Sequence, residues 1–286
     1  MTGVSAPSNL TSLRARVRNA AIGDAKLTRR LELIVADTAV GQMLPPGVVK
    51  GGAAIKIRLG EAETRATRDL DAARAADLSL EAYLELLDER LAAGWAGFTG
   101  TVRDLDGPSP KDVPVDYVMH PFQIRLSYRG SFWFNITFEL GRDEIGSTSR
   151  PEVRISPSIV ALFETLGLPK PGPIPLLPVD HQVAQKLHAC TWLDRNGNND
   201  RAHDLVDLQL LVREERPDLG RVRRTARRLF QSRRAQTWPP TVVAHSDWDS
   251  LYRAAAEGLD VIDRVDEAVS WANELINRID GASAGT

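Results

Sequence analysis

The stretch from Val48 to Asp71 constrains this chain more than any other part of its sequence. The short β-branched run Val48-Val49 leads into the pair Gly51-Gly52, and a basic segment then leads to Asp69-Leu-Asp71. Adjacent glycines let a backbone approach a ligand closely, and at the start of a helix their N–H groups favour an anion. On a strand, Asp69 and Asp71 would point to one face, where a hard divalent cation relieves the repulsion between carboxylates.

A phosphate cradle beside a divalent-metal site is the equipment of phosphoryl or nucleotidyl transfer. Four further residues are candidate phosphate contacts, because basic and hydroxyl side chains bind phosphate oxygens; these are Lys50, Arg65, Thr67 and Arg68. Each part also has a simpler interpretation. Gly-Gly is common in loops, Asp-x-Asp is common on solvated strand ends, Lys50 fits a solvated strand end, and the arginines can balance the charge of the acids.

The chain from residue 97 to residue 140 contains four strand-like runs, at 97–102, 113–119, 122–128 and 131–140. The last two flank Arg129-Gly130, which predicts a hairpin turn. Alternation in the last run predicts an apolar face of Phe132, Phe134, Ile136 and Phe138 and a mostly polar face that ends in Glu139. Glu139 and Asp116, which lies in the second run, are the two candidates for a third carboxylate.

Composition places the chain among ordinary globular proteins. It has 286 residues, of which 43% are hydrophobic and 26% charged, and a formal charge of −2. The charge gives no global reason to expect nucleic acid, so an RNA site must be a local patch. The single cysteine, Cys190, excludes an internal disulfide framework. We find no signal peptide and no apolar run of membrane-spanning length, and therefore expect a cytoplasmic protein without a membrane partner.

Hydrophobic periodicity predicts several helices, and a Pro- and Gly-rich stretch at 167–178 predicts a domain boundary. The first domain is expected to span residues 1–170 and the second residues 171–286. The expected helices are 10–20, 24–44, 78–93, 156–166, 180–193, 201–212, 219–234 and a pair within 246–278 that is broken near Gly258. The second domain is therefore expected to be helical.

The helices at 180–193 and 201–212 form a predicted hairpin that brings charged residues together. Asp204 and Asp207 are three residues apart and share a helix face, and Lys186 on the partner helix can face them. The intervening turn, Asp194 to Asp200, alternates Asp and Asn like a calcium loop, but it lacks the glycine and the bidentate glutamate that such a loop needs. We interpret it as a surface turn. His181, His188 and His203 form no zinc pattern and are expected to serve packing or to lie at the surface.

Gly-Gly followed by Asp-x-Asp resembles the signature of the DNA polymerase β-like nucleotidyltransferase superfamily. The fuller pattern adds Ala after the glycines, Arg-Leu-Gly, Arg-x-Thr and Asp-Leu-Asp, and it is similar to the AbiEii/AbiGii toxin branch, which includes MenT-type toxins. Lys186 and the run Arg201-x-x-Asp204-x-x-Asp207 resemble two further motifs of that branch. Gln185 stands where the family usually has an acid, which puts only a supporting salt bridge in question.

The resemblance implies an α+β, bilobed protein: a nucleotidyltransferase core on a mixed, antiparallel-rich sheet, a C-terminal helical lobe, and an active site in the cleft between them. It favours Glu139 over Asp116, because the family places its third acid late in the antiparallel run. The implied catalytic residues are Asp69, Asp71, Glu139, Lys186, Asp204 and Asp207. The implied metal ligands are Asp69, Asp71 and Glu139, which would bind Mg²⁺ or Mn²⁺. Gly51, Gly52, Lys50, Arg65, Thr67 and Arg68 would hold a nucleoside triphosphate (NTP).

In the family the acceptor can be the 3′ end of tRNA, whose modification blocks translation, and the toxin has a cognate antitoxin protein. The basic segment 219–234 suits an RNA backbone, and Arg221, Arg224 and Arg228 line one predicted helix face. A solvated face or a contact with an acidic protein is the alternative for this segment. Two rival functions also remain: a nucleotidyltransferase that modifies a protein or small molecule, and a non-catalytic member that binds nucleotide or a partner.

Overall fold

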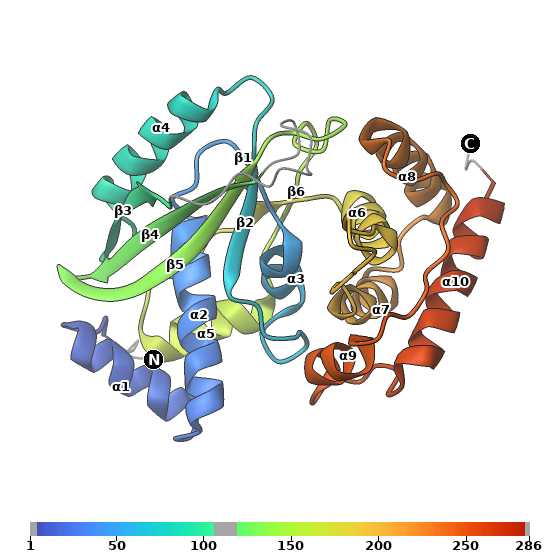
Figure 1. Ribbon diagram of the computed structural model, residues 1–286. Coiled ribbons are helices and arrows are strands. Elements are labelled where there is room, and N and C mark those ends of the chain that lie inside the picture. Colours follow the sequence, from blue (N-terminus) through green and yellow to red (C-terminus); the bar gives the residue numbers. More distant parts are fainter. Residues whose placement is uncertain (1–4, 106–118, 284–286) are drawn as a thin grey trace. The chain divides into compact units, whose positions relative to one another are not determined.

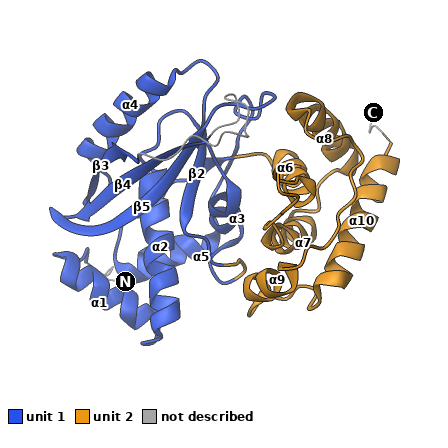
Figure 2. Cartoon of the chain, in the orientation of Figure 1, with its two compact units in different colours: residues 1–62, 66–176 blue, residues 63–65, 177–286 orange. Residues whose placement is uncertain are grey.

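The computed structural model describes residues 5–105 and 119–283. The chain divides into two compact units, which Figure 2 colours separately. Unit 1 comprises residues 1–62 and 66–176, and unit 2 comprises residues 63–65 and 177–286. The second unit therefore includes three residues that come from within the first unit's stretch of sequence. The boundary expected between residues 170 and 171 stays a prediction.

Unit 1 contains a mixed sheet to which seven strands of the described chain contribute, in the order β3-β4-β5-β2-β1-β7-β6. The pairs β2–β5 and β1–β7 are parallel, and the other neighbours are antiparallel. The strands are β1 (Gly47–Lys50), β2 (Asp69–Arg74), β3 (Phe98–Asp104), β4 (His120–Tyr128), β5 (Ser131–Gly141), β6 (Glu152–Arg154) and β7 (Ile174–Leu176). The strand β7 lies inside the stretch that the sequence suggested as a linker.

The helices of unit 1 are α1 (Leu10–Ala20), α2 (Ala25–Gly41), α3 (Gly51–Leu59), α4 (Leu80–Ala93) and α5 (Pro157–Leu166). The starts of α1, α2, α4 and α5 follow from capping residues, because side-chain oxygens accept hydrogen bonds from the first free N–H groups. Asp24 caps α2 by accepting from Leu27 N, and Ser79 caps α4 by accepting from Ala82 N. Figure 1 shows α3 beside β2, with α1, α2 and α5 grouped together. The predicted helices of this half are confirmed to within a few residues.

The predicted alternation of buried and exposed residues in β5 is wrong at the start of the strand, at Phe132 and Trp133. Phe132 is 41% exposed, whereas Trp133, expected on the polar face, is only 3% exposed. The register against β4 shifts at this point, since Leu126 pairs with Phe134 but Ser127 pairs with Phe132. This bulge leaves Trp133 without a direct partner in β4 and reverses the phase of the strand. Beyond the bulge the prediction holds, and Ile136 and Phe138 are buried.

Unit 2 is helical and comprises α6 (Val179–Thr191), α7 (His203–Glu215), α8 (Leu219–Arg233), α9 (Trp248–Ala256) and α10 (Val265–Gly281). The expected hairpin of α6 and α7 and the break near Gly258 are confirmed. Together with the mixed sheet of unit 1, these helices confirm the predicted α+β class. No helix in the part of the chain that the structure describes is long and apolar enough to cross a membrane. Residues 113–118 of the strand-like run at 113–119, with Asp116, lie outside the described residues.

Candidate active site

The glycine pair stands at the junction of β1 and α3, as expected. Gly51 is the first residue of α3 and has a φ of +62°, which favours glycine. A Cβ atom added to Gly51 would lie 1.9 Å from Oδ2 of Asp71. The capping residue Lys50 makes no side-chain capping hydrogen bond, so it supplies no oxygen to the first N–H groups of α3. The helix start therefore meets the carboxylate of Asp71 at a distance that only glycine permits.

Three charged residues form a row across three neighbouring strands. Asp71 is in register with Lys50 of β1 on one side and with Glu139 of β5 on the other. Residues paired in register project their side chains from the same face of a sheet. Asp69, two residues before Asp71, shares this face, whereas the intervening Leu70 is fully buried on the other. The sheet thus places Asp69, Asp71 and Glu139 on one face, as the sequence predicted.

The donor atoms on this face suit a hard divalent cation. Mg²⁺ takes one or two protein carboxylates and completes its shell with phosphate oxygens and water. Asp69 and Asp71 supply two half-buried carboxylates at i and i+2. Among the described residues, no group of three or more His, Cys, Asp and Glu side chains is arranged to hold a metal ion. The residues present therefore fit a cation held by two carboxylates together with a bound triphosphate.

The basic residues before β2 separate in the structure. Thr67 is half-buried and Arg68 is exposed, and both lie in unit 1 just before Asp69. Arg65 belongs to unit 2, where its Nε and Nη2 donate to Oδ1 and Oδ2 of Asp207 at 3.0 and 2.8 Å. The guanidinium fork expected to hold phosphate is thus engaged by a carboxylate.

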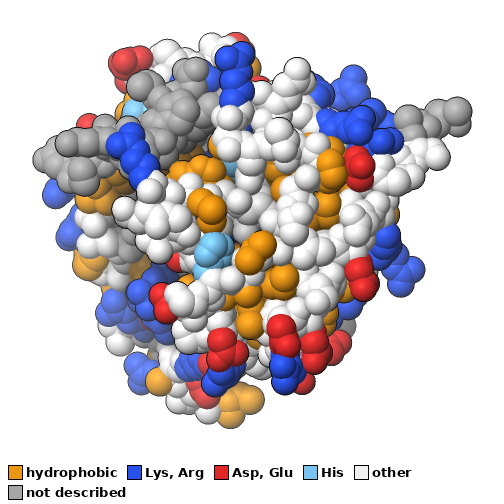
Figure 3. Space-filling view, turned by 45° about the vertical axis from the view of Figure 1, so that its right-hand side comes forward, with side chains coloured by type: hydrophobic (Ala, Val, Ile, Leu, Met, Phe, Trp, Pro, Cys, Tyr) orange, Lys and Arg blue, Asp and Glu red, His pale blue; other side chains and the backbone are white. Residues whose placement is uncertain are grey.

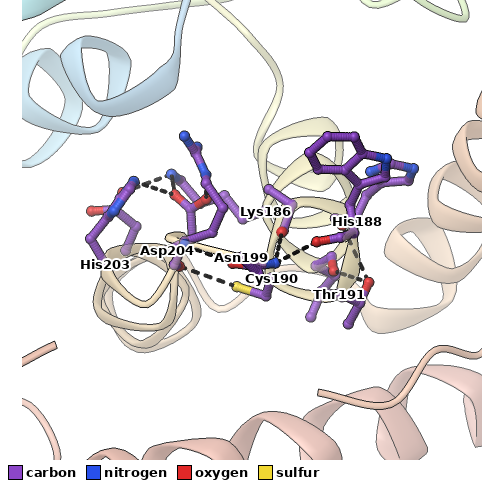
Figure 4. Close-up of polar contacts among 12 residues, drawn as sticks. Lys186, His188, Cys190, Thr191, Asn199, His203 and Asp204 are labelled. Carbon is purple, nitrogen blue, oxygen red and sulfur yellow. Dashed lines mark hydrogen bonds and ion pairs between the residues drawn. The ribbon is translucent and has the colours of Figure 1, made fainter. Parts of the chain in front are cut away.

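Lys186 and the two aspartates of α7 form a buried ion-pair network. Nζ of Lys186 lies 2.7 Å from Oδ1 of Asp204 and 2.7 Å from Oδ2 of Asp207. Arg201 donates from Nε to the other oxygen of Asp204 at 2.8 Å. Figure 4 shows Lys186 and Asp204 among the polar contacts of α6 and α7. Each carboxylate therefore lies between Lys186 and an arginine, which for Asp207 is Arg65. The predicted approach of Lys186 to both aspartates is present.

Electrostatics keeps this network ionised. Burial acts to raise the pKa of Asp204, but Lys186 and Arg201 outweigh it and hold that pKa well below its ordinary value. Burial acts to lower the pKa of Lys186, but Asp204 and Asp207 raise it above its ordinary value. Lys186 is therefore a fixed cation at neutral pH. Its arrangement suits the stabilisation of negative charge better than the donation of a proton.

His203 lies beside this network, although the sequence suggested only a packing or surface role. Its Nε2 is 3.6 Å from Oδ1 of Asp204. Burial lowers the pKa of His203 to about 4, so the imidazole is neutral at neutral pH. His188 instead packs against the ring of Phe230, with centroids 5.0 Å apart. Burial also raises the pKa of Cys190 well above its ordinary value, which leaves its thiol unreactive.

The turn that imitates a calcium loop is closed by its own hydrogen bonds. Oδ1 of Asp194 accepts from the backbone N–H groups of Asn196 and Asn198 at 2.8 and 2.7 Å. These bonds stabilise the charged carboxylate and lower the pKa of Asp194. A pocket of about 530 Å³ lies beside the turn and is also lined by Trp192 and His245. The carboxylate of Asp194 thus closes the turn itself, which agrees with the predicted surface turn.

The basic helix α8 presents several exposed arginines. Arg221, Arg224 and Arg228 are exposed, and Nε of Arg221 lies 3.4 Å from Oδ2 of the buried Asp180. Two further arginines of α8 form ion pairs with Asp280 of α10. Figure 3 shows Lys and Arg side chains at several places on one molecular face, some of them next to acidic side chains. Several exposed positive charges therefore lie on α8, although the whole chain has a formal net charge of −2.

Comparisons with known proteins identify a family and a similar fold for this chain. Residues 37–272 match the family described as "Nucleotidyl transferase AbiEii toxin, Type IV TA system". Among solved structures, the fold resembles MenT4, a nucleotidyltransferase toxin from Mycobacterium tuberculosis H37Rv, with a TM-score of 0.54 and 19% identity over 93% of this chain and 98% of that one. The comparison with curated proteins found no match. The family match spans most of the chain and confirms the resemblance seen in its motifs, and the chain belongs to the AbiEii family of nucleotidyltransferase toxins of type IV toxin–antitoxin systems.

Proposed function

We propose that this protein transfers a nucleoside monophosphate from an NTP to the 3′ end of tRNA and thereby blocks aminoacylation and translation. The observation that supports it best is the close approach of the Asp71 carboxylate to Gly51, the first residue of α3, because a candidate metal ligand then lies beside a helix start, which favours an anion such as phosphate. The family supplies the reaction class. The tRNA acceptor is inferred from the resemblance of the motifs and from the exposed arginines of α8. Such a reaction takes place in the cytoplasm, where both substrates occur.

The triphosphate would be bound by the N–H groups of Gly51 and Gly52 and by Lys50, Thr67 and Arg68. Mg²⁺ or Mn²⁺, held by Asp69 and Asp71, would supply charge neutralisation on the phosphates. In the row across the sheet, Lys50 lies on the other side of Asp71 from Glu139. Lys50 and Glu139 are therefore both direct neighbours of Asp71 along the row, which supports assigning them to the same site.

The transfer step forms a bond between the 3′ oxygen of the acceptor and the α-phosphorus. The bond from the α-phosphorus to the bridging oxygen breaks, and pyrophosphate leaves with the electron pair. Glu139 would take the proton of the acceptor hydroxyl, because it stands next to Asp71 on the same sheet face. Lys186 would stabilise the charge on pyrophosphate as a fixed cation, and Asp204 and Asp207 would hold it in place.

Labelled NTPs, each supplied singly with magnesium and total tRNA, test this proposal. We expect label on tRNA with the wild-type protein and none with Asp71→Ala or Lys186→Ala. Asp77→Ala is the matched control, because Asp77 is an exposed acid shortly after β2. Circular dichroism is needed for Lys186→Ala, since this change leaves buried carboxylates. Label on protein instead of RNA would support the first rival function, and bound nucleotide without transfer would support the non-catalytic one.

The family also implies an antitoxin as a protein partner. The exposed arginines of α8 offer an alternative surface for such a partner if it is acidic. Substitutions that neutralise Arg221, Arg224 and Arg228 distinguish an RNA contact from an antitoxin contact. If these arginines contact RNA, the substitutions should weaken nucleotide transfer to tRNA. If transfer remains intact, the helix serves another contact.

A further inference from the structure

Lys56 is a buried lysine of α3 to which the reaction above gives no role. Only 1% of it is exposed. Its Nζ lies 3.5 Å from Oδ2 of Asp37, 3.8 Å from Oε2 of Glu61 and 3.4 Å from the carbonyl oxygen of Thr67. A buried charge is costly even when it is paired. Its presence in the core of unit 1 therefore needs an explanation.

The three oxygen partners connect α2 with the two ends of one segment, residues 61–67. At the first end, Arg30 donates to the side chain of Glu61 at 2.5 Å and to its carbonyl at 2.6 Å, while Lys56 lies near the other carboxylate oxygen. At the second end, the ammonium of Lys56 contacts the Thr67 carbonyl, two residues before Asp69. This segment also carries Arg65, the partner of Asp207. Lys56 thus contacts both ends of the segment that leads into the acid strand β2.

Stability alone accounts poorly for this arrangement. Oδ1 of Asp37 is buried and has no hydrogen-bond partner in the described parts of the chain. An acceptor left unsatisfied in the interior destabilises the folded state, and a buried ion pair is often no more stable than an apolar replacement. What the ammonium does supply is a fixed donor for the Thr67 carbonyl, which few buried groups could replace.

We propose that Lys56 is a positioning residue that fixes residues 61–67 through Glu61 and the Thr67 carbonyl, and so sets the placement of Asp69 and Asp71 for a divalent cation. The proposal rests on the proposed function for the identity of the cation ligands. The claim that Lys56 fixes residues 61–67 rests only on the contacts of Lys56. The two parts therefore call for two different measurements.

The test compares Lys56→Met/Asp37→Asn with Asp37→Asn alone. The shared Asp37→Asn change prevents a buried carboxylate from losing its cation, and Glu61 keeps Arg30 as a partner. The single variant is the matched control because it retains Lys56 and its contact with Thr67. If the double variant does not fold by circular dichroism, Lys56→Gln/Asp37→Asn replaces it and is judged by the same criteria. A glutamine keeps a polar side chain at this position but is too short to reach the place of Nζ.

The first measurement is amide hydrogen exchange of peptides that cover residues 61–71, without metal or nucleotide. We expect exchange about tenfold faster in the double variant than in Asp37→Asn, with the rest of the sheet unchanged. The second is the affinity for Mn²⁺ alone, by titration calorimetry, which should fall about tenfold or more in the double variant and stay within about twofold in the control. Equal exchange and equal Mn²⁺ affinity in both variants would overturn the proposal.

The outcomes also distinguish this inference from the proposed function. If the wild-type protein binds no Mn²⁺, the assignment of Asp69 and Asp71 as cation ligands fails, and hydrogen exchange alone decides the role of Lys56. A second outcome is that wild type binds Mn²⁺ and the double variant exchanges faster at 61–71 without losing Mn²⁺ affinity. In that case the claim that Lys56 sets the placement of Asp69 and Asp71 is wrong, while the proposed function stands.

Discussion

The carboxylate of Asp71 lies against the α-carbon of Gly51, so close that a Cβ there would be 1.9 Å from Oδ2. The two residues belong to consecutive parts of one motif, the start of α3 and the strand β2. Their contact explains why the first residue of the pair is glycine. Position 51 has a positive φ of +62°, which favours glycine, and it leaves no room for a side chain beside Asp71.

Gly51→Ala should reduce the rate of nucleotide transfer by about 100-fold while leaving most of the fold intact. The added methyl group displaces the carboxylate of Asp71, and a misplacement of about 1 Å costs about 100-fold in rate. The positive φ adds a stability cost of about 1–2 kcal/mol. The measurement is NTP transfer together with thermal unfolding. Gly130→Ala is the control, because Gly130 has a φ of +78° but no atom within 4 Å of an added Cβ. It should lose similar stability and keep its activity; full activity in Gly51→Ala would refute the assignment.

Lys186→Met should destabilise the protein and eliminate transfer. The change removes the cation between Asp204 and Asp207, which are 0% and 1% exposed. Breaking a buried ion pair lowers the free energy of unfolding by about 3–5 kcal/mol. We expect a loss near the lower end of this range, because Asp204 keeps its contact with Arg201 and Asp207 keeps its contact with Arg65. Urea unfolding measures the loss. Lys170→Met, at an exposed lysine, should change stability by less than about 0.5 kcal/mol. A similarly small change for Lys186→Met would mean that the network contributes little.

Asp37 should make stability depend on pH in the weakly acidic range. Burial raises the pKa of Asp37 to about 6 from an ordinary value of 3.8. Since the native state then binds the proton more tightly, this contribution is fully present below the unfolded pKa of about 4 and is lost as pH rises through about 6. Over that window, wild type should lose up to about 3 kcal/mol relative to Asp37→Asn. Urea unfolding of both proteins between pH 4 and pH 7 checks this. A difference that stays constant would contradict it.

Neutralising Arg224 and Arg228 together should reduce the salt dependence of tRNA binding. Each arginine that contacts a phosphate contributes nearly one unit to the slope of log affinity against log salt, so the slope should fall by about two. Filter binding across a salt series measures it. Arg253→Gln serves as the control, because Arg253 is an exposed arginine of α9 that is paired with Asp249. An unchanged slope in the double variant would exclude an RNA contact on this face.

Local patterns in the sequence predicted much of the fold. The helices at 24–44 and 78–93, the hairpin turn at Arg129-Gly130 and the helix start at the glycine pair depend on residues close together in the chain. The family match confirmed the resemblance for the same reason, since its motifs are short and lie in order. The alternation of β5 failed because the bulge at Trp133 depends on the register of the neighbouring strand.

The sequence by itself therefore determined the α+β class, the family and the residue types of the candidate site. Only the tertiary structure decided their partners. It paired Arg65 with Asp207, 142 residues away, and placed Lys56 between Asp37, Glu61 and Thr67. Ion pairs of this kind form wherever folding buries opposite charges together, and no local pattern records which charges meet. The roles of Arg65 and Lys56 thus became visible only once the chain was folded.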